Sequence, residues 1–337
     1  MVIRRIVFEK NPDGGAVTKK TIQTSYHLPF NAHASGGESG IILAAVLILL
    51  GVIVALALHA QVLARACLNL ENKRLLQTQL RETAGDGVWR ALNALADDQN
   101  FLVDHTNEAW AAPMYLRLPN GIDTEVVIID ENRFLDANML AFVSAAEQWR
   151  RPEMLVRDLL AAQGSLNPET ETEIIRDWVD QNTEGHYEKE YYRRQQAQFY
   201  PDNLPMESRE ELLWLLGTAT NSAAGTNALA VLPAQKPRIE PVNVNTAGRP
   251  ALLAIFGGGN AALVERIIHG RDAMPLFTLE QVMDPLTLQK FANYISLKSS
   301  FFSVYSRAVM GAAAEAVYCL VKRDQTGNIQ VIRWVEQ

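Results

Sequence analysis

The sequence predicts an α+β fold that combines one long N-terminal helix, a small sheet and a large helical block inserted into that sheet. Three observations predict it. Residues 41–58 form an apolar run without a charged residue or a proline. Two short strand-like runs come before a long stretch of helical patterns, and three β-rich runs close the chain after it. Strands on both sides of a helical block indicate one sheet with an insertion.

The apolar run has the length of a membrane-spanning helix. At ~1.5 Å per residue, Ile41–Leu58 extends roughly 27 Å, close to the hydrocarbon thickness of a bilayer. A cleaved secretory signal has a shorter apolar region that ends in a small-x-small site. This run instead continues into an amphipathic half, in which Gly85 and Gly87 are expected to loosen the helix. The apolar positions of that half are Leu76, Leu80, Ala84, Val88, Ala91 and Leu95.

Composition excludes several classes of protein. The formal net charge is −7, which argues against a general nucleic-acid binder, because such a protein needs a basic surface. The two cysteines, Cys67 and Cys319, make no disulfide scaffold, and whether they are free thiols stays open. The six histidines form no H-E-x-x-H motif, and no G-x-S-x-G occurs. We therefore expect no enzyme activity.

The start of the apolar helix carries a specific signal. Gly40 stands directly before Ile41 and follows a polar segment. This arrangement resembles the processing site of type IV prepilins and type II secretion pseudopilins, in which a prepilin peptidase cuts after the glycine. The resemblance implies cleavage between Gly40 and Ile41. The alternative is a flexible joint before a transmembrane helix, since the leader is long and its end, "GGES", is not basic.

The fifth residue of the implied mature chain, Ala45, lacks the usual carboxylate. Most pseudopilins have glutamate there, and a carboxylate inside a membrane is costly unless it is paired. Its partner is the N-terminal amine of a neighbouring subunit. A subunit with none above it has no use for the carboxylate. The chain therefore resembles the minor pseudopilin family called general secretion pathway protein K, which lacks this glutamate and caps the filament tip.

Motif order along the rest of the chain supports this resemblance. "IIRDWVDQNTEGHYEKEYYRRQQAQFYPDNLPMESREELLWLLG", Ile174 to Gly217, is similar to the family's first helical subdomain. "VNVNTAGRPALLAIFGGGNAALVERIIHGRDAMPLFTLEQVM", Val242 to Met283, is similar to its helix-hairpin-helix segment. The resemblance implies a pilin-like fold: a long transmembrane helix packed on a small antiparallel sheet, with a large all-α insert containing a helix-hairpin-helix (SAM-like) segment.

This fold divides the chain into six parts. They are a prepilin-type leader (1–40), a transmembrane helix (41–60), the pilin-like helix and first strands (61–135), a first helical insert subdomain (136–240), a helix-hairpin-helix insert subdomain (241–297) and the closing strands (298–337).

One loop is a candidate metal site. "DQNTEGHYEKEY" begins like a calcium loop, with oxygen-bearing Asp180, Asn182 and Glu184 at alternate positions and Glu188 nearby. The glutamate that an EF-hand needs at position twelve is replaced by Tyr191, so this is not an EF-hand. K-type proteins hold calcium in their helical insert, so the resemblance implies that this acidic loop binds calcium. The alternative is a solvated acidic loop without metal.

The second insert segment, Val242 to Met283, contains patterns for two other functions, dinucleotide binding and DNA binding. "GGGNAA" fits a dinucleotide-binding pattern, but Pro250 and the apolar residues after it predict a helix where that pattern needs a strand. A helix-hairpin-helix can bind DNA, yet three arginines balance three acidic residues between Val242 and Met283. A membrane-tethered DNA-uptake protein therefore stays the alternative function, and no nucleic acid is expected.

The favoured function follows from the resemblance. It implies a minor pseudopilin that caps the tip of the type II secretion pseudopilus and supports export of folded proteins across the outer membrane. The implied partners are the minor pseudopilins I and J, other pseudopilins and the prepilin peptidase. The implied location is the inner membrane, crossed once, with most of the chain in the periplasm.

Overall fold

The computed structural model describes residues 2–9, 18–25, 39–141, 151–220, 228–233 and 239–337. Within it the chain forms two compact units, residues 1–71 and 72–337, each of which is described by itself.

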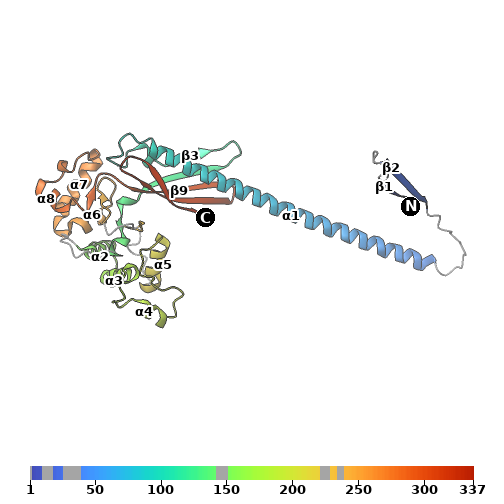
Figure 1. Ribbon diagram of the computed structural model, residues 1–337, viewed down its shortest axis with the longest axis horizontal. Helices are drawn as coiled ribbons and strands as arrows, with labels where there is room; N and C mark the ends of the chain where they lie inside the picture. Colours follow the sequence, from blue (N-terminus) through green and yellow to red (C-terminus); the bar gives the residue numbers. More distant parts are fainter. Residues whose placement is uncertain (1, 10–17, 26–38, 142–150, 221–227, 234–238) are drawn as a thin grey trace. The chain divides into compact units, whose positions relative to one another are not determined.

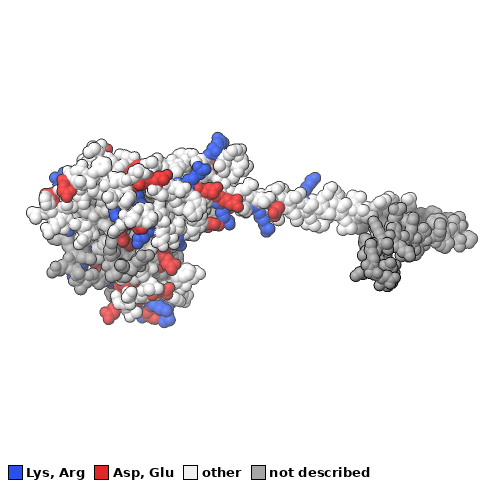
Figure 2. Space-filling view, turned by 45° about the horizontal axis from the view of Figure 1, so that its top comes forward, with Lys and Arg blue, Asp and Glu red and all other residues white. Residues whose placement is uncertain are grey.

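The first unit contains a hairpin and the apolar part of the long helix. Strands β1 (Val2–Glu9) and β2 (Thr18–Ser25) pair in antiparallel fashion. Helix α1 (Ser39–Ala96) is continuous, and every residue from Gly40 to Glu71 is exposed. The run Ile41–Leu58 of this helix contains no charged residue, and Figure 2 shows the part of it that grey atoms leave visible as a white stretch. These apolar side chains are exposed among the described residues, so they are available to lipid or to other helices.

Among the described residues, α1 is one helix long and apolar enough to cross a membrane, with a mean hydropathy of 3.3 over its most apolar window. The helix pair Arg249–Phe256 and Gly258–Ala273 passes the same test only when counted together, and it is bent by 113°. Residues of both members lie in a hydrophobic core. This pair is therefore explained by packing inside the protein.

The second half of α1 packs on a five-stranded antiparallel sheet of order β11-β10-β9-β4-β3 (Figure 1). The α1 residues Leu80, Ala84, Val88 and Leu95 are almost fully buried in the core between helix and sheet. Strands β4 and β9 are neighbours although the whole insert separates them in the sequence. The strand bounds are β3 Met114–Arg117, β4 Asp123–Asp130, β9 Phe301–Met310, β10 Ala313–Arg323 and β11 Ile329–Glu336. The predicted α+β fold, a long apolar helix on an antiparallel sheet, is confirmed.

The expectation that Gly85 and Gly87 loosen α1 is wrong, because the helix runs through both without a break. Gly87 is instead a point of close approach. A Cβ atom there would lie 2.8 Å from Val126 Cγ2 and still closer to Ser306 Oγ. Gly85 has more room, since its nearest neighbour would be Trp334 at 3.6 Å. Gly87 therefore lets the helix backbone approach strands β4 and β9 closely.

The insert between β4 and β9 is mainly helical (Figure 1). Its α-helices are α2 Pro152–Ala162, α3 Pro168–Val179, α4 Lys189–Arg194, α5 Arg209–Thr220, α6 Arg249–Phe256, α7 Ala261–Ala273 and α8 Pro285–Phe291. Its short 3-10 helices are η2 Glu131–Arg133, η3 Ala137–Ala141, η5 Gly258–Asn260 and η6 Leu279–Gln281, whereas η1 Ala109–Ala111 lies before β3, outside the insert. Two-residue parallel bridges join β5 (Leu135–Asp136) to β6 (Leu229–Ala230) and β7 (Val242–Asn243) to β8 (Ile295–Ser296).

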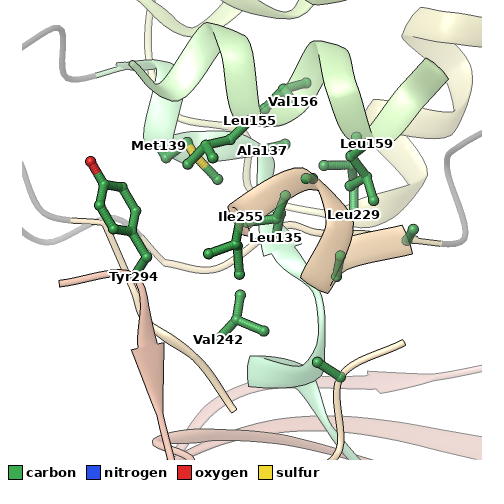
Figure 3. Packing of buried hydrophobic residues seen from close by; sticks show 14 of the residues in the cluster. Leu135, Ala137, Met139, Leu155, Val156, Leu159, Leu229, Val242, Ile255 and Tyr294 are labelled. Carbon is green, nitrogen blue, oxygen red and sulfur yellow. The ribbon is translucent and has the colours of Figure 1, made fainter. Parts of the chain in front are cut away.

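One hydrophobic core joins helices from both parts of the insert. Figure 3 shows Leu155 and Leu159 of α2 near Ile255 of α6, and Leu135 and Val242 belong to the same core. Burial of this many aliphatic side chains is the main stabilising contribution available to the insert. The expected division at residue 240 therefore falls between segments that share a core, and the six-part division of the chain stays a prediction.

The segment expected to be a helix-hairpin-helix forms α6, a glycine turn and α7. Pro250 lies in the first turn of α6, and Gly257 ends that helix with a φ of 80°, a value that favours glycine. A helix thus precedes "GGGNAA" where a dinucleotide-binding loop would need a strand.

Candidate functional site

The residues of the implied processing site lie at the beginning of α1. Gly40 and Ile41 are the second and third residues of the helix, and both are exposed. Ala45 follows about one turn later and is also exposed, and the first turn of α1 contains no acidic residue. The region before Ser39 lies in part outside the described residues. Cleavage between Gly40 and Ile41 stays a prediction.

The acidic loop between α3 and α4 buries one of the four predicted metal ligands, Asp180, and one carboxylate oxygen of a second, the half-buried Glu188. Asp180 directly follows α3 and is 3% exposed, and its Oδ1 has no hydrogen-bond partner among the described residues. The Oε1 of Glu188, the residue before α4, is also buried without a partner there. Burial raises the pKa of both carboxyl groups, and the negative charge of Asp177 raises both further. Two carboxylates are thus short of positive partners.

The other two predicted ligands are exposed. The Oδ1 atom of Asn182 accepts a 2.7 Å hydrogen bond from the backbone N–H of Glu184, so this oxygen holds the turn. Within the described residues, the acidic group compact enough for a metal is a different one, Asp98, Asp104 and Glu108. The assignment of Asn182 and Glu184 as ligands stays a prediction.

Asp177 is a member of the acidic cluster that sequence reasoning missed. Its side chain is fully buried and forms an ion pair with Arg176 at 2.8 Å. It also accepts a 2.9 Å hydrogen bond from the Tyr187 N–H. A Cβ on Gly185 would collide with this carboxylate, with Oδ1 only 2.7 Å away. Gly185 is therefore needed where the loop folds back on α3. The i, i+3 spacing of Asp177 and Asp180 at a helix end was the available signal.

The cluster meets the chemical requirements of a calcium site in part. Calcium prefers several hard oxygen ligands in a flexible arrangement, and carboxylates are the usual donors. Asp180 and Glu188 each offer a buried oxygen without a partner, and Asp177 adds negative charge beside them. Asn203 donates to Glu188 and to the Asn182 carbonyl, which ties the loop to the segment before α5. Asp180 and Glu188 would be the residues to hold a calcium ion, and calcium binding at this loop stays a prediction.

An aromatic cluster makes the base of this loop rigid. Trp178 donates a 2.6 Å hydrogen bond from Nε1 to Glu211 of α5. Its ring packs edge-on against Tyr192 of α4 and tilted against Trp214 of α5, with centroids 5.4 and 5.6 Å away. Such ring pairs add to the stabilisation from area burial alone. The acidic loop therefore starts and ends on elements that are fixed to each other.

A second acidic cluster joins the sheet to the insert and was not found from the sequence. Arg323 of β10 pairs with Asp98 at 2.8 Å and with Asp104, and all three side chains are buried. Asp104 also accepts a 2.6 Å hydrogen bond from the Ser299 N–H, and the Asn243 side chain donates to its carbonyl. Burial raises the pKa of Asp104 to about 6 against the opposing effect of Arg323. Because these carboxylates already have protein partners, their role here is structural.

The arginines of the helix-hairpin-helix are not arranged as a phosphate-binding surface. Arg249 pairs with Glu265 at 2.7 Å, and Arg271 donates to the Val244 carbonyl. Arg266 is exposed on α7. On the face shown in Figure 2, basic and acidic side chains are interspersed. These observations give the DNA-binding alternative no support beyond the motif itself.

A membrane-length helix that continues onto an antiparallel sheet, together with an all-α insert, defines a membrane-anchored, pilin-like subunit. No protein-family model matches the chain. It is 25% identical to type II secretion system protein K of Pseudomonas aeruginosa over 325 residues, which cover 88% of this chain and 92% of that protein. The predicted resemblance to the K family of minor pseudopilins is confirmed. Proteins of this family are structural components of a secretion system rather than known enzymes.

The fold is also that of a solved K-type structure. A chain of the crystal structure of the GspK–GspI–GspJ complex, from the type 2 secretion system of enterotoxigenic Escherichia coli, superposes with a TM-score of 0.61. The two chains are 19% identical, and the match covers 79% of this chain and 98% of the other. This similarity shows that the two chains share a fold over the matched part.

Proposed function

We propose that this chain is the minor pseudopilin that caps the tip of a type II secretion pseudopilus and supports export of folded proteins across the outer membrane. The observation that carries the proposal is similarity to a K protein over 88% of the chain, together with an α1 that begins without a carboxylate. In this proposal α1 anchors the chain in the inner membrane, and the rest lies in the periplasm.

Ala45 gives the physical reason for a position at the tip. A carboxylate within the membrane costs ~2.5–3.5 kcal/mol by insertion scales unless it is neutralised. In a stacked filament the N-terminal amine of the subunit above supplies that neutralisation. A tip subunit has no subunit above it, so an apolar residue is favoured at this position. The insert, which lies between β4 and β9, adds bulk that is harmless only at an end.

The proposed partners are other pilin-like subunits. The solved complex that this chain resembles contains K, I and J proteins. We expect this chain to bind the minor pseudopilins I and J through its pilin-like part, to contact other pseudopilins below it, and to be cut by the prepilin peptidase between Gly40 and Ile41. Calcium bound at Asp180 and Glu188 would stabilise the insert.

Crosslinking in cells tests the position in the filament. Cys67 is exposed on α1, whereas Cys319 is buried, so a thiol-specific crosslinker has one accessible site on this chain among the described residues. Crosslinks should join Cys67 to other pseudopilins, and quantitative mass spectrometry should find about one copy per filament. Cys67→Ser provides the control without crosslinks.

A contradicting result would be a Cys67–Cys67 crosslinked dimer of this chain, or several copies per filament by mass spectrometry, since a repeating subunit is not a cap. Ala45→Glu provides an independent arm. The variant should secrete less efficiently than Ala45→Val, which changes the same position without adding a charge. Equal secretion by both variants would remove the argument from the missing carboxylate.

A further inference from the structure

A polar pocket lies where the sheet region meets the helix-hairpin-helix, away from the acidic loop. Its volume is about 350 Å³. Its walls include His105 and Asn107 from the loop after α1, Arg133 from η2, and Arg271 near the end of α7. Residues from three separate parts of the sequence therefore line one space large enough for an amino-acid side chain.

Two guanidinium groups border this pocket with an incomplete set of partners. The Nε of Arg133 is buried and has no hydrogen-bond partner among the described residues. Arg271 donates one 2.5 Å hydrogen bond to the Val244 carbonyl, and its nearest carboxylate oxygen, on Asp272, is 4.0 Å away. Burial lowers the pKa of Arg271, and the positive charge of Arg133 lowers it further. Two like charges thus repel each other across a concave surface.

The wall of the pocket opposite solvent is held in place by hydrogen bonds. Asn245 donates to and accepts from the backbone of Leu276 at 2.9 and 3.0 Å. Thr246 donates a 2.5 Å hydrogen bond to the buried Asp130 carboxylate. These side chains are already paired, so they give the pocket a fixed shape and leave the arginines to act on a ligand.

We propose that this pocket binds a carboxylate group, held by Arg133 and Arg271. A guanidinium offers parallel N–H donors that match the two oxygens of a carboxylate, and an anion between two arginines relieves their repulsion. The charge balance distinguishes carboxylate from phosphate. Asp272 lines the pocket, and the C-terminal end of α7, with its partial negative charge, lies beside it. A monoanion is tolerated there better than a dianion.

The ligand's carboxylate would come either from a free small acid or from an acidic side chain of a protein partner. A ligand in this position contacts both the sheet region, through Arg133, and the insert, through Arg271. It would hold these two parts of the fold together. This inference does not depend on the proposed position of the chain in a filament.

Titration calorimetry on the full chain in nanodiscs tests the proposal. The probes are a Gly-Glu dipeptide with acetylated and amidated ends, its Gly-Gln counterpart, sodium acetate and inorganic phosphate. We expect millimolar binding of Gly-Glu, none of Gly-Gln, and weaker binding of phosphate. Arg133→Gln should weaken Gly-Glu binding at least ~10-fold, as expected for loss of a charge-assisted hydrogen bond. Arg266→Gln, an exposed arginine on the same helix, is the matched control.

Arg271→Lys keeps the positive charge but removes the parallel N–H donors of the guanidinium group. It should also weaken carboxylate binding, and the variant is expected to fold because the charge is kept. Acetate binding as tight as that of the dipeptide would assign the site to free acids, and tighter dipeptide binding would assign it to protein side chains. Both results support a carboxylate site. Three results would overturn it. Neither the dipeptide nor acetate binds at about 10 mM, phosphate binds more tightly than the dipeptide, or Arg133→Gln binds the dipeptide as tightly as the wild-type chain does.

Discussion

Replacing Gly87 by alanine tests whether α1 is held against the sheet by close packing. The new methyl group would lie 2.8 Å from Val126 Cγ2 and closer still to Ser306 Oγ. Overpacking of this kind costs about 1–3 kcal/mol of stability. Alanine also favours a helix over glycine by about 0.8–1.0 kcal/mol. The two effects oppose each other, so the variant alone gives an ambiguous magnitude.

Gly85→Ala separates the two effects because it lies in the same helix. Its methyl group would meet Trp334 at 3.6 Å, an ordinary contact. The helix-propensity gain is the same in both variants and cancels in their difference. Gly87→Ala should therefore be less stable than Gly85→Ala by about 1–3 kcal/mol. For a protein of this size each kcal/mol shifts the melting temperature by about 1–2 °C.

Thermal unfolding of the full chain in detergent, followed by circular dichroism, measures this difference. A second arm uses Ser306→Ala, which removes the closest atom. The Ser306 hydroxyl is buried without a hydrogen-bond partner among the described residues, so its removal alone should change stability little. In the double variant the Gly87→Ala penalty should shrink by about 0.5–3 kcal/mol. If Gly87→Ala is at least as stable as Gly85→Ala, the close-approach explanation is refuted.

Three further predictions concern cleavage, metal and pH. Gly40→Val should block cleavage before Ile41, whereas the control Gly51→Val should not. Mass spectrometry of the membrane-inserted protein measures the N-terminus of each variant. An intact leader on the wild-type chain would contradict the predicted cleavage. Calcium at a concentration ten times its Kd should stabilise the full chain by about 1.4 kcal/mol, because it binds only the folded state. Asp180→Ala should lose this gain. An unchanged melting temperature in millimolar calcium would oppose the prediction. Burial raises the pKa of Asp136 from 3.8 to about 7, so its folded-state carboxyl binds a proton more tightly than the unfolded one. The stability that this group contributes is therefore complete below pH 4 and is lost as pH rises towards 7. Urea unfolding at several pH values should show that Asp136→Asn flattens this decline by up to ~1.4 kcal/mol per pH unit. Equal slopes of stability against pH in the variant and the wild-type chain would contradict this.

Several features followed from sequence patterns because they depend on neighbours along the chain. An uncharged run of membrane length has few alternatives to a transmembrane helix, so Ile41–Leu58 was recognisable without a fold. The apolar spacing after it predicted the buried face of α1, including Leu80 and Val88. The closing strands were also visible as β-rich runs. The helical insert and the K-family resemblance followed from the order of motifs.

The acidic loop shows where sequence reasoning stopped. The pattern from Asp180 to Glu184 indicated a calcium loop, because oxygen-bearing residues alternate there. The structure instead buries Asp180 and one oxygen of the half-buried Glu188, and it adds Asp177 from the preceding helix. The way the loop folds against α3 decides which side chains turn inward. That folding requires Gly185, because a side chain there would collide with Asp177. The spacing of residues along the chain does not predict this contact.

The sequence by itself determined the class of the protein: a membrane-length helix, a strand-bounded helical insert and a start without a carboxylate. Local periodicity and composition are enough for these features. Only the tertiary structure decided that Arg323 joins Asp104, that Arg133 and Arg271 border one pocket, and that Gly87 touches β9. The partners in each case are far apart in the sequence. Their meeting depends on the pairing of β4 with β9, which brings the two ends of the sheet region together around the insert.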